Sequence, residues 1–421
     1  MKAVIHPGLL HGTVERVICS KSAGHRALIC AAMAEGETLL EGLDWCEDLT
    51  ATRKGLEAMG ACFRPEGEAW RVIPGRTAGK VFLDCGESGS TLRFLLPLTA
   101  ALGQEAELTG RGKLASRPLF PLDEQMMEHG AWLSERGVFP LRVSGRLRAG
   151  KYTLAGNVSS QFISGLLMAL PLAEGDSRIV ITGELQSGPY VDMTLGMMAR
   201  FGVDVRREEG GFLIRGGRGY ASPGQLRVEG DWSGAAFWLA AGALSPEGLR
   251  VRGLDLSSAQ GDRRMLALLR AFGAETMAAG EEVVVRARPM HGVEIDAGDI
   301  PDLVPVLAVV AAAARGETRI RRIARLRLKE SDRVASVLAL LSALGVSARA
   351  GEDEMVIEGR GGFTGGEVDS FRDHRIAMAA AVAACAAEGP VVIREAQAVS
   401  KSYPGFFEQF RLLGGRVKEE D

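Results

Sequence analysis

One hydrophobic pattern recurs along the whole chain: an amphipathic segment ends in glycine and is followed by a short β-like run. The glycines of this pattern are Gly60, Gly130, Gly202, Gly273, Gly345 and Gly414. In a second pattern, an alanine-rich segment ends in glycine before a β-like run, and its glycines are Gly36, Gly103, Gly175, Gly248, Gly316 and Gly389. Glycine is expected just after the last turn of a helix, where a positive φ is common. Both series repeat at about 70 residues and predict six copies of one unit, each with two helices and several short strands.

The length of this repeat indicates the fold class. Glycine ends many helices, which is the alternative explanation for either series, but coincidence does not explain two series with one period. A unit of about 70 residues is longer than common solenoid repeats. The six copies are therefore expected to form two pseudo-symmetric domains of three units each, of α/β (α+β) class. The midpoint falls near residues 229–231, and the site is expected in the interdomain cleft, because ligands often bind between domains.

The overall charge limits the possible partners. The 421 residues include 50 Lys and Arg against 53 Asp and Glu, a net charge of −3. This is too close to neutral to attract nucleic acid or an anionic membrane, so neither is an expected partner and any anion site must be built locally. The apolar runs at residues 303–314 and 376–387 are shorter than the ~18 residues of a membrane span and predict buried helices.

The cysteines and the N-terminal residues indicate a cytoplasmic enzyme. Residues 1–10 include Lys2 and Pro7 but no apolar core of a signal peptide. The six cysteines contain no CxxC pair, and a chain of this length needs no disulfides to fold. We therefore expect reduced thiols and no export.

Candidate anion-binding residues in the first half begin with Lys21, Ser22 and Arg26. They precede an alanine-rich helix expected over residues 27–34, and helix N-termini favour anions. Lysine and arginine side chains can bind phosphate or carboxylate oxygens there. Arg117, held beside a proline, is a further cation of this half. A capped, solvated helix start is the alternative reading of the first segment.

Two Gly/Ser-rich segments of the first half lead into apolar helices. Residues 86–93 precede an apolar segment at 94–102, and such a loop can bind an anion through successive backbone N–H groups. Residues 159–161 place two hydroxyls and an amide before a helix expected at 163–172. Neutral donors of this kind suit a hydroxylated or phosphorylated ligand. A structural turn and an ordinary helix cap are the respective alternatives.

The second half has the candidate acids and bases. Asp302 precedes the apolar run that follows it, and residues 329–333 hold four charges. Asp373 and Arg375 begin the last apolar run, and Lys401 stands near the end of the chain. Asp302 could simply cap a helix, and charge runs usually form a solvated surface.

Together these residues suggest a cleft for two anionic substrates. The cations beside turn or helix-start signals are Lys21, Arg26, Arg117, Arg333, Arg375 and Lys401. The acid–base candidates are Asp302 and Glu330. Neither a GxxxxGK[ST] motif nor a GxGxxG motif after a predicted strand is present, which disfavours a nucleotide-binding enzyme.

Ten short motifs resemble those of the 5-enolpyruvylshikimate-3-phosphate synthase family, in order along the chain. They are residues 21–26, 86–93, 117–118, 159–161, 189–190, 229–231, 300–302, 329–333, 373–375 and 401–404. Any one is weak, but the ordered set covers the chain from end to end and is specific. The resemblance implies transfer of the enolpyruvyl group from phosphoenolpyruvate to the 5-hydroxyl of shikimate 3-phosphate, with release of phosphate and with no metal or organic cofactor.

The resemblance also implies an architecture. The family fold has two domains of three βαβαββ-type units, which agrees with the six copies inferred from the glycines. In this chain one domain would span residues 20–229, and the other would combine residues 1–19 with residues 230–421. Such proteins are commonly monomers, so a monomer is expected.

Roles follow from the resemblance motif by motif. Shikimate 3-phosphate would contact Lys21, Ser22, Arg26, Ser159, Ser160, Gln161, Ser187, Asp302 and Lys329. Phosphoenolpyruvate would contact Lys21, Gly89, Arg117, Gln161, Arg333, Arg375 and Lys401. Asp302 is the expected base toward the 5-hydroxyl, and Glu330 is expected to protonate the methylene carbon and later to remove a proton from the resulting methyl. Lys21 would neutralise or protonate the departing phosphate.

Two residues depart from the family pattern. Glu87 stands where the family usually has asparagine, and its charge should weaken phosphoenolpyruvate binding unless it points outward or pairs with a cation. Lys113 replaces a frequent arginine, a milder change. Gly89 is retained, and since the herbicide glyphosate binds where phosphoenolpyruvate does in this family, sensitivity to glyphosate is expected.

Two alternatives remain within the same fold. The related transferase acting on UDP-N-acetylglucosamine uses a catalytic cysteine in the loop that corresponds to residues 110–118, and this chain has none there. A catalytically silent anion-binding relative would be expected to lack Lys21, Asp302, Glu330 or Lys401, all of which are present. Both readings are disfavoured.

Overall fold

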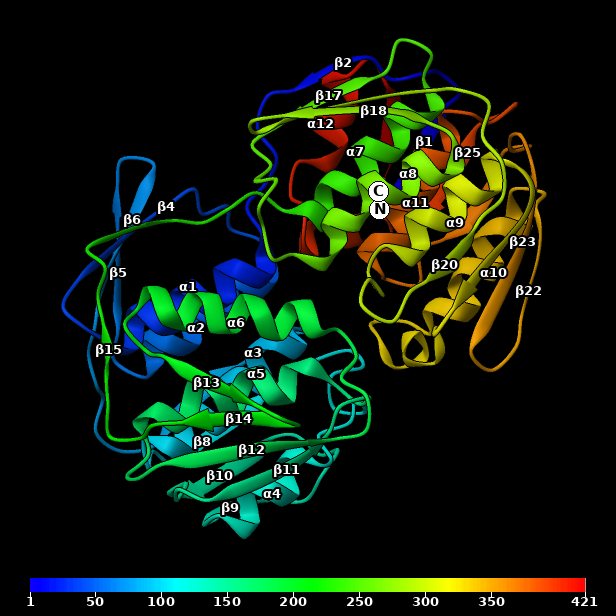
Figure 1. Cartoon of the computed structure of the whole chain (residues 1–421). Coiled ribbons are helices and arrows are strands. Elements are labelled where there is room, and N and C mark those ends of the chain that lie inside the picture. The colour runs from blue at the N-terminus through cyan, green and yellow to red at the C-terminus, as the bar shows by residue number, and fades with distance from the viewer. Residues whose placement is uncertain (421) are drawn as a thin grey trace. The chain divides into compact units, whose positions relative to one another are not determined.

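The structure is a computed structural model that describes residues 1–420, and the chain divides into two compact units (Figure 1). The stretch Lys21–Val228 forms one unit, the continuous unit. Residues 1–20 and the chain from Glu229 onward form the other, the split unit. The chain therefore leaves the split unit after Ser20 and returns to it at Glu229.

Each unit contains three four-stranded sheets. In the continuous unit they are β16 (Gln225–Arg227), β4 (Thr38–Glu41), β6 (Ala69–Ile73) and β5 (Cys62–Glu66); β7 (Val81–Asp84), β8 (Ala106–Thr109), β10 (Leu141–Gly145) and β9 (Ala131–Leu133); β11 (Lys151–Ala155), β12 (Ser177–Thr182), β14 (Gly211–Ile214) and β13 (Val205–Glu208). In the split unit they are β2 (Gly12–Val14), β17 (Leu249–Arg252), β19 (Glu282–Arg286) and β18 (Glu275–Ala279); β20 (Glu294–Asp296), β21 (Arg315–Arg321), β23 (Glu354–Arg360) and β22 (Ser347–Ala350); β24 (Gly366–Asp369), β25 (Val391–Arg394), β1 (Lys2–His6) and β26 (Arg416–Glu420). A short parallel pair, β3 (Ala34–Glu35) and β15 (Tyr220–Ala221), adds to the continuous unit.

All six sheets have one strand order. The edge strand named first above pairs in parallel with its neighbour, and the two remaining pairs are antiparallel. The sixth sheet is completed by the N-terminal strand, since β1 lies between β25 and β26 and pairs Lys2 with Glu420. Six copies of one order confirm the predicted six-unit α/β fold.

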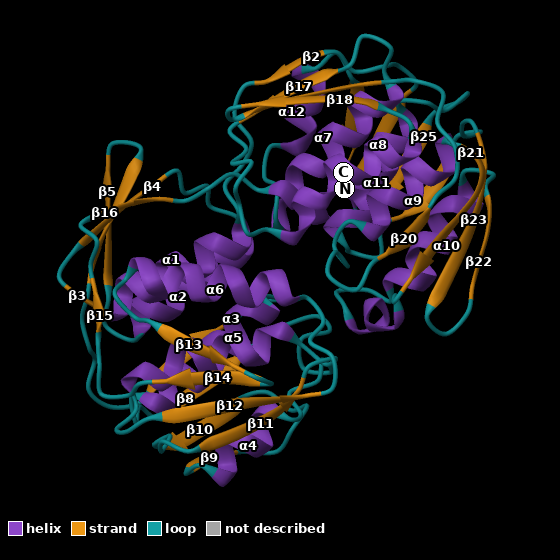
Figure 2. Cartoon of the chain, viewed as in Figure 1, coloured by secondary structure: helices purple, strands orange, loops and turns teal. Residues whose placement is uncertain are grey.

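Each repeat also contributes two α-helices. In the continuous unit they are α1 (Lys21–Met33), α2 (Glu47–Ala58), α3 (Gly89–Ala101), α4 (Leu122–Glu128), α5 (Ser160–Ala169) and α6 (Gly188–Arg200), with a 3₁₀ helix η1 (Leu170–Leu172). In the split unit they are α7 (Trp232–Leu244), α8 (Met265–Phe272), α9 (Val304–Ala313), α10 (Arg333–Ala343), α11 (His374–Ala384) and α12 (Phe406–Leu412), with η2 (Gly261–Arg264), η3 (Ala324–Leu328) and η4 (Ala396–Lys401). Figure 2 shows α1, α2, α3, α5 and α6 grouped together in the continuous unit, with α4 apart from them beside β9 and β11.

The first helix of each repeat lies in the core. In the split unit α7, α9 and α11 pack against one another, and Trp232 and Trp238 of α7 are fully buried. A helix that is apolar on every side must be surrounded by protein, and α9 and α11 confirm the buried helices predicted from the two apolar runs. None of the helices within residues 1–420 combines the length and the apolar character that crossing a membrane requires.

The glycine series behaves largely as predicted. All six glycines of the first series have positive φ, from 75° at Gly202 to 112° at Gly273. In the second series five do so, whereas Gly389 does not.

Three helices begin earlier than the sequence predicted. The helix expected over residues 27–34 begins at Lys21, and those expected at 94 and 163 begin at Gly89 and Ser160. The polar residues thought to precede these helices form their first turns. The reason is physical: first-turn N–H groups have no partner within the helix, so hydroxyl residues are well placed there. The predicted helix at 163–172 also ends early, at Ala169, and continues as the 3₁₀ helix η1.

Candidate active site

Lys21, at the start of α1, forms an ion pair with Asp48 in the first turn of α2. The Lys21 Nζ lies 2.7 Å from Oδ2 of Asp48, and the two side chains are 17% and 6% exposed. Asp48 was not predicted, because an acid in the first turn of a helix ordinarily stabilises the helix. The ion pair shows another role for Asp48, because its carboxylate orients the ammonium group of Lys21, a candidate catalytic residue.

Arg26 is buried and uses its guanidinium within the continuous unit. Its Nε donates to Oγ1 of Thr194 at 2.7 Å, Nη1 donates to the Ser22 carbonyl at 2.6 Å, and Nη2 donates to the Tyr190 carbonyl at 2.9 Å. Burial lowers the pKa of Arg26 to about 10. These bonds tie α1 to α6, so Arg26 holds the helices together, and its contact with substrate stays a prediction.

Gln161 joins the Gly/Ser segment to the segment around Arg117. Its Oε1 accepts a bond from Nη1 of Arg93 at 2.6 Å, and its Nε2 donates to Oγ of Ser90 at 2.9 Å. The Nη2 of Arg93 donates to the carbonyl of Pro118 at 2.9 Å. The structure thus brings together three of the predicted segments. Arg93 was noticed in its motif but was given no role.

Gly89 and Arg117 lie against each other. A Cβ atom built on residue 89 would be 2.7 Å from Nη1 of Arg117. No side chain fits there without moving the guanidinium. Two residues predicted to contact one substrate are therefore neighbours.

Glu87 lies against the segment that contains Arg117. A Cβ atom at Gly112, which has a φ of +60°, would be 2.7 Å from Oε1 of Glu87. Glu87 is partly buried. Its carboxylate is therefore directed to the segment of residues 110–118, next to the predicted anion site.

The candidate serines all lie at helix starts in the continuous unit. Ser159 caps α5, since its Oγ accepts a bond from the Gln161 N–H at 3.3 Å, so the capping alternative holds for it. Ser160 and Ser22 stand in the first turns of α5 and α1. Ser187 precedes α6 with a φ of 57°, a left-handed conformation that is uncommon for serine and is often found at functional sites.

Arg333 is the centre of an acidic cluster in the split unit. It is 1% exposed. Its Nη1 lies 2.7 Å from Oδ1 of Asp302, its Nη2 lies 2.8 Å from Oε2 of Glu330, and its Nε lies 2.8 Å from Oδ2 of Asp373. One guanidinium thus holds both candidate acid–base residues. The charge run at 329–333 is not merely a solvated surface.

Asp302 is surrounded by cations. Besides Arg333, its Oδ2 lies 3.0 Å from Nη2 of Arg375, and its Oδ1 lies 3.5 Å from Nζ of Lys329. Burial opposes ionisation, but Arg375, Lys329 and Arg333 outweigh it and hold the pKa of the Asp302 carboxyl well below its usual range. Leu303, not Asp302, is the cap residue of α9, so the capping alternative does not hold.

Asp373 supports this cluster from the start of α11. Its carboxylate accepts bonds from the Arg375 N–H at 3.0 Å and from Oγ of Ser331 at 3.0 Å, besides the bond from Arg333. It therefore fixes both arginines. The sequence had placed Asp373 only as the neighbour of Arg375. Lys401 ends η4 in the same unit and is buried.

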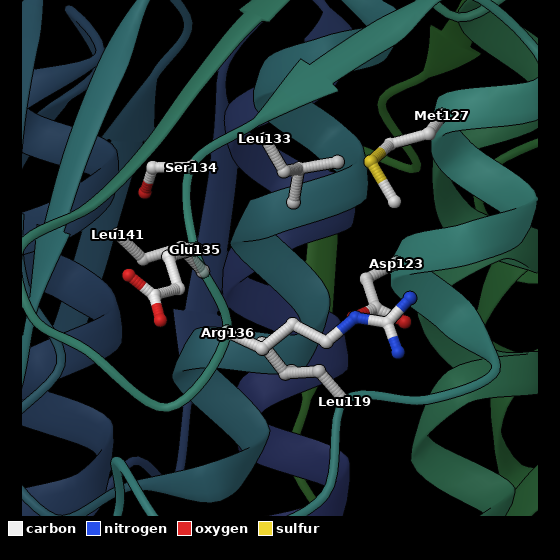
Figure 3. A pocket seen from close by; sticks show the side chains of 8 residues that line it. All are labelled: Leu119, Asp123, Met127, Leu133, Ser134, Glu135, Arg136 and Leu141. Atoms are coloured by element: carbon white, nitrogen blue, oxygen red, sulfur yellow. The ribbon is translucent and has the colours of Figure 1, made fainter.

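A cavity of about 210 Å³ lies in the continuous unit (Figure 3). It is lined by Leu119, Asp123, Met127, Leu133, Ser134, Glu135, Arg136 and Leu141. The guanidinium of Arg136 lies across it, with Nε 2.5 Å from Oδ2 of Asp123. None of the predicted site residues lines this cavity.

The candidate residues form two clusters, one around Lys21, Gln161 and Arg117 in the continuous unit and one around Arg333 in the split unit. Both suit anionic substrates, and the second also suits proton transfer. Each unit supplies cations next to helix N-termini, and the split unit adds two carboxylates held by one arginine. Within residues 1–420 no group of three or more His, Cys, Asp or Glu side chains is placed to hold a metal ion.

Comparisons with known proteins agree with this fold. The family model described as EPSP synthase (3-phosphoshikimate 1-carboxyvinyltransferase) matches residues 4–410. A 3-phosphoshikimate 1-carboxyvinyltransferase of Clostridium perfringens strain 13 is 42% identical over 426 residues, covering 100% of both chains. That of Clostridium kluyveri is 43% identical over 423 residues, covering 99% of this chain and 98% of the relative.

Solved structures share the fold. An EPSP synthase from Acinetobacter baumannii has a TM-score of 0.81 at 27% identity and covers 99% of this chain and 100% of its own. The enolpyruvyl transferase NikO from Streptomyces tendae has a TM-score of 0.79, covers 99% of this chain and 98% of its own, and at 19% identity shows the fold alone.

The fold is thus that of solved EPSP synthase and enolpyruvyl transferase structures. Within this class the family match over residues 4–410 and the full-length relatives are decisive. The chain belongs to the EPSP synthase (3-phosphoshikimate 1-carboxyvinyltransferase) family and is a transferase of the shikimate pathway.

Proposed function

We propose that the two residue clusters together transfer the enolpyruvyl group from phosphoenolpyruvate to the 5-hydroxyl of shikimate 3-phosphate. The observation that supports this most is the arginine-centred cluster, in which Arg333 holds Asp302 and Glu330 beside Arg375. The family match over nearly the whole chain supports the same reaction.

The proposed substrate contacts come from both units. Shikimate 3-phosphate is held by Lys21, Ser22, Arg26, Ser159, Ser160, Gln161, Ser187, Asp302 and Lys329. Phosphoenolpyruvate is held by Lys21, Gly89, Arg117, Gln161, Arg333, Arg375 and Lys401. Each substrate has a carboxylate and a phosphate. The many Lys and Arg side chains assigned to the site therefore match four anionic groups. Arginines can hold a carboxylate through two bonds and so fix its orientation.

The reaction proceeds by addition and then elimination. The 5-hydroxyl oxygen adds to C2 of phosphoenolpyruvate while its proton passes to Asp302, and C3 takes a proton from Glu330 to become a methyl group. In the second step Glu330 removes a proton from that methyl, the bond from C2 to the phosphate oxygen breaks, and the enol ether forms. Lys21 neutralises or protonates the departing phosphate. Each proton transfer of this kind typically accelerates the reaction by about 10²- to 10⁴-fold.

The cations around Asp302 set a condition for its role as a base. A carboxylate with three cationic neighbours binds a proton weakly, which is why its pKa is low in this structure. Arg333 and Arg375 are also among the residues assigned to phosphoenolpyruvate. When they bind an anionic group of that substrate they neutralise Asp302 less, so the proton affinity of Asp302 rises as the substrate arrives. In this proposal the substrate itself prepares the base.

The proposed compartment is the cytoplasm. All six cysteines are free thiols, which suits a reducing compartment. All the assigned residues belong to one chain, so we propose a monomer. The proposed domains are residues 20–229 and residues 1–19 with 230–421.

The role of Glu330 can be tested by following deuterium in the substrate. In D₂O the enzyme should place deuterium on C3 of phosphoenolpyruvate during turnover. The reason is that Glu330 can remove any of the hydrogens of the methyl group when the intermediate returns to substrate. E330Q should lower both the turnover and the exchange by at least about 100-fold, while E352Q, at an exposed acid of the same unit, should change neither. Near-normal exchange in E330Q would assign this proton to another group.

A further inference from the structure

Three hydroxyl side chains and a histidine form a buried chain of hydrogen bonds between the first three helices of the continuous unit. The chain runs from His25 in α1 through Thr52 in α2 to Thr91 in α3, and it ends at Ser88, the cap of α3. All four side chains are at most 1% exposed, and the proposed mechanism uses none of them. An apolar side chain of similar shape would fill such a place without needing a partner. The hydroxyl groups therefore call for an explanation beyond packing.

The Thr91 hydroxyl is the branch point of this chain. Its Oγ1 lies 2.7 Å from Oγ1 of Thr52, 2.8 Å from Oγ of Ser88 and 3.3 Å from the backbone carbonyl oxygen of Asp48. The last two atoms are acceptors for its single proton. The Thr91 N–H also donates to Oγ of Ser88 at 3.2 Å. Because Asp48 lies in the first turn of α2, Thr91 ties that turn to the first turn of α3.

The number of protons fixes the direction of the remaining bonds. A hydroxyl group has one proton to donate, and Thr91 gives its own to one of the two acceptors just named, so it accepts the bond from Thr52. The Thr52 hydroxyl then accepts a bond from the Nδ1–H of His25, 2.8 Å away. His25 stays neutral in the folded protein, because burial lowers its pKa to about 3. The imidazole thus keeps the Thr91 hydroxyl in its donating orientation.

The apolar contacts between these helices do not depend on the hydroxyl groups. α1 approaches α2 at Gly24, where a Cβ atom would lie 3.0 Å from the side chain of Leu49. α2 approaches α3 at Gly55, where a Cβ atom would lie 2.5 Å from Cδ1 of Leu95. Such close packing holds the bodies of the helices in place. Loss of the hydroxyl bonds should therefore release the first turns without separating the helices.

We propose that Thr91 is a positioning residue for phosphoenolpyruvate. The first turn of α2 orients Lys21 through the Asp48 carboxylate, 2.7 Å from the ammonium nitrogen. The first turn of α3 contains Gly89, which lies against Arg117. By joining the two turns, Thr91 fixes the ammonium and guanidinium groups at the spacing that this substrate needs. The proposal rests on the assignment of both cations to phosphoenolpyruvate, which is part of the proposed function.

The test compares T91V with T91S and T99V. Valine keeps the shape of threonine and removes the hydroxyl, whereas serine keeps the hydroxyl. Thr99 is the matched control, because it is fully buried in the same helix and its hydroxyl donates to the Leu96 carbonyl at 2.8 Å. We expect the KM for phosphoenolpyruvate to rise about tenfold in T91V and to stay within about twofold in T91S and T99V. The KM for shikimate 3-phosphate, which has many other assigned contacts, should change less than about threefold in all three.

These variants separate positioning from a structural role. A role in the fold alone would lower the stability of T91V and T99V alike and leave the KM of the folded enzyme unchanged. A KM for phosphoenolpyruvate in T91V equal to that in T99V therefore overturns the proposal. An equal rise in T91S and T91V does so as well, because the hydroxyl group would then not be responsible.

Two further variants keep the result interpretable. T52V removes the bond that orients the Thr91 hydroxyl, so it should also raise the KM for phosphoenolpyruvate, and T52V/T91V should exceed T91V by less than about twofold. An unchanged KM in T52V overturns the proposal even where T91V does not fold, and so do independent effects of the two substitutions. R117Q separates the two levels: an unchanged KM for phosphoenolpyruvate contradicts the proposed function, whereas a raised KM in R117Q with T91V equal to T99V contradicts only the role of Thr91.

Discussion

Gly89 and Arg117 are neighbours across two segments of the continuous unit, and a Cβ atom on residue 89 would lie 2.7 Å from Nη1 of the arginine. Gly89 begins α3, whereas Arg117 lies further along the chain in a segment of turns. The glycine gives the guanidinium room beside the first turn of the helix. Since both residues are assigned to phosphoenolpyruvate, this contact sets the shape of its site.

Substituting Gly89 by alanine should therefore displace Arg117. We expect the KM for phosphoenolpyruvate to rise about tenfold, equivalent to about 1.4 kcal/mol, with the KM for shikimate 3-phosphate within about twofold of its value. Inhibition by glyphosate, which competes for the same place in this family, should weaken as well. Steady-state kinetics with each substrate varied measure these changes. G196A is the matched control, because nothing lies within 4 Å of a Cβ there; equal effects of the two substitutions would refute the steric account.

Replacing Glu87 by asparagine should strengthen phosphoenolpyruvate binding. The carboxylate lies against Gly112 in the segment of Arg117, where it opposes an anionic ligand. We expect E87N to lower the KM for phosphoenolpyruvate about threefold, as the loss of a partly exposed charge interaction of under 1 kcal/mol would do. The effect should shrink at 1 M salt. A higher KM in E87N would instead mean that Glu87 orients a cation of the site.

The ion pair of Lys21 with Asp48 should matter for catalysis more than for stability. D48N leaves the lysine without the carboxylate that lies 2.7 Å from it, so the ammonium loses its fixed position. We expect kcat/KM to fall by at least about tenfold. E47Q, at the exposed neighbour in the same helix turn, should stay within about twofold. If D48N keeps full activity, Lys21 does not depend on this pair.

His25 should make the protein sensitive to acid. It is buried, and its Nδ1 lies 2.8 Å from Oγ1 of Thr52. Burial lowers its pKa from 6.5 to about 3, with Asp48 partly opposing this. The unfolded chain therefore binds a proton below pH 6.5 that the folded chain does not, and stability is lost as the pH falls from 6.5 toward 3.

The loss due to His25 should reach about 3 kcal/mol between pH 6.5 and pH 4. Urea unfolding at the two pH values measures it. H25N should lose correspondingly less than the unsubstituted protein over this interval, whereas H6N, at an exposed position, should follow the unsubstituted protein. An equal loss in H25N would mean that other groups cause the acid sensitivity.

The repeat was predictable because its signals are local. A glycine after a helix reports a positive φ, as found at Gly60 and Gly273, and apolar runs such as residues 303–314 can only be buried helices. Helix starts were placed too late because polar first turns resemble loops when hydrophobicity alone is read. The hydroxyl that caps α3 at Ser88 is the signal that could have corrected this.

The supporting residues of the site were not predictable, since their roles exist only in the folded chain. Asp48 looks like an ordinary first-turn acid, and only its distance to Lys21 shows its function. Asp373 looks like an ordinary helix cap, and only its distance of 2.8 Å to Arg333, far along the chain, shows a second role. Spacing in the sequence contains no information on such contacts.

Phosphate release from the purified protein is the most direct test of the proposed transfer. Phosphoenolpyruvate is supplied with and without shikimate 3-phosphate, in buffer that contains EDTA. We predict release only with both substrates, undiminished by the chelator, and reduced by at least about 100-fold in D302N. No release from the folded protein with both substrates, or release from phosphoenolpyruvate alone, would contradict the proposed transfer.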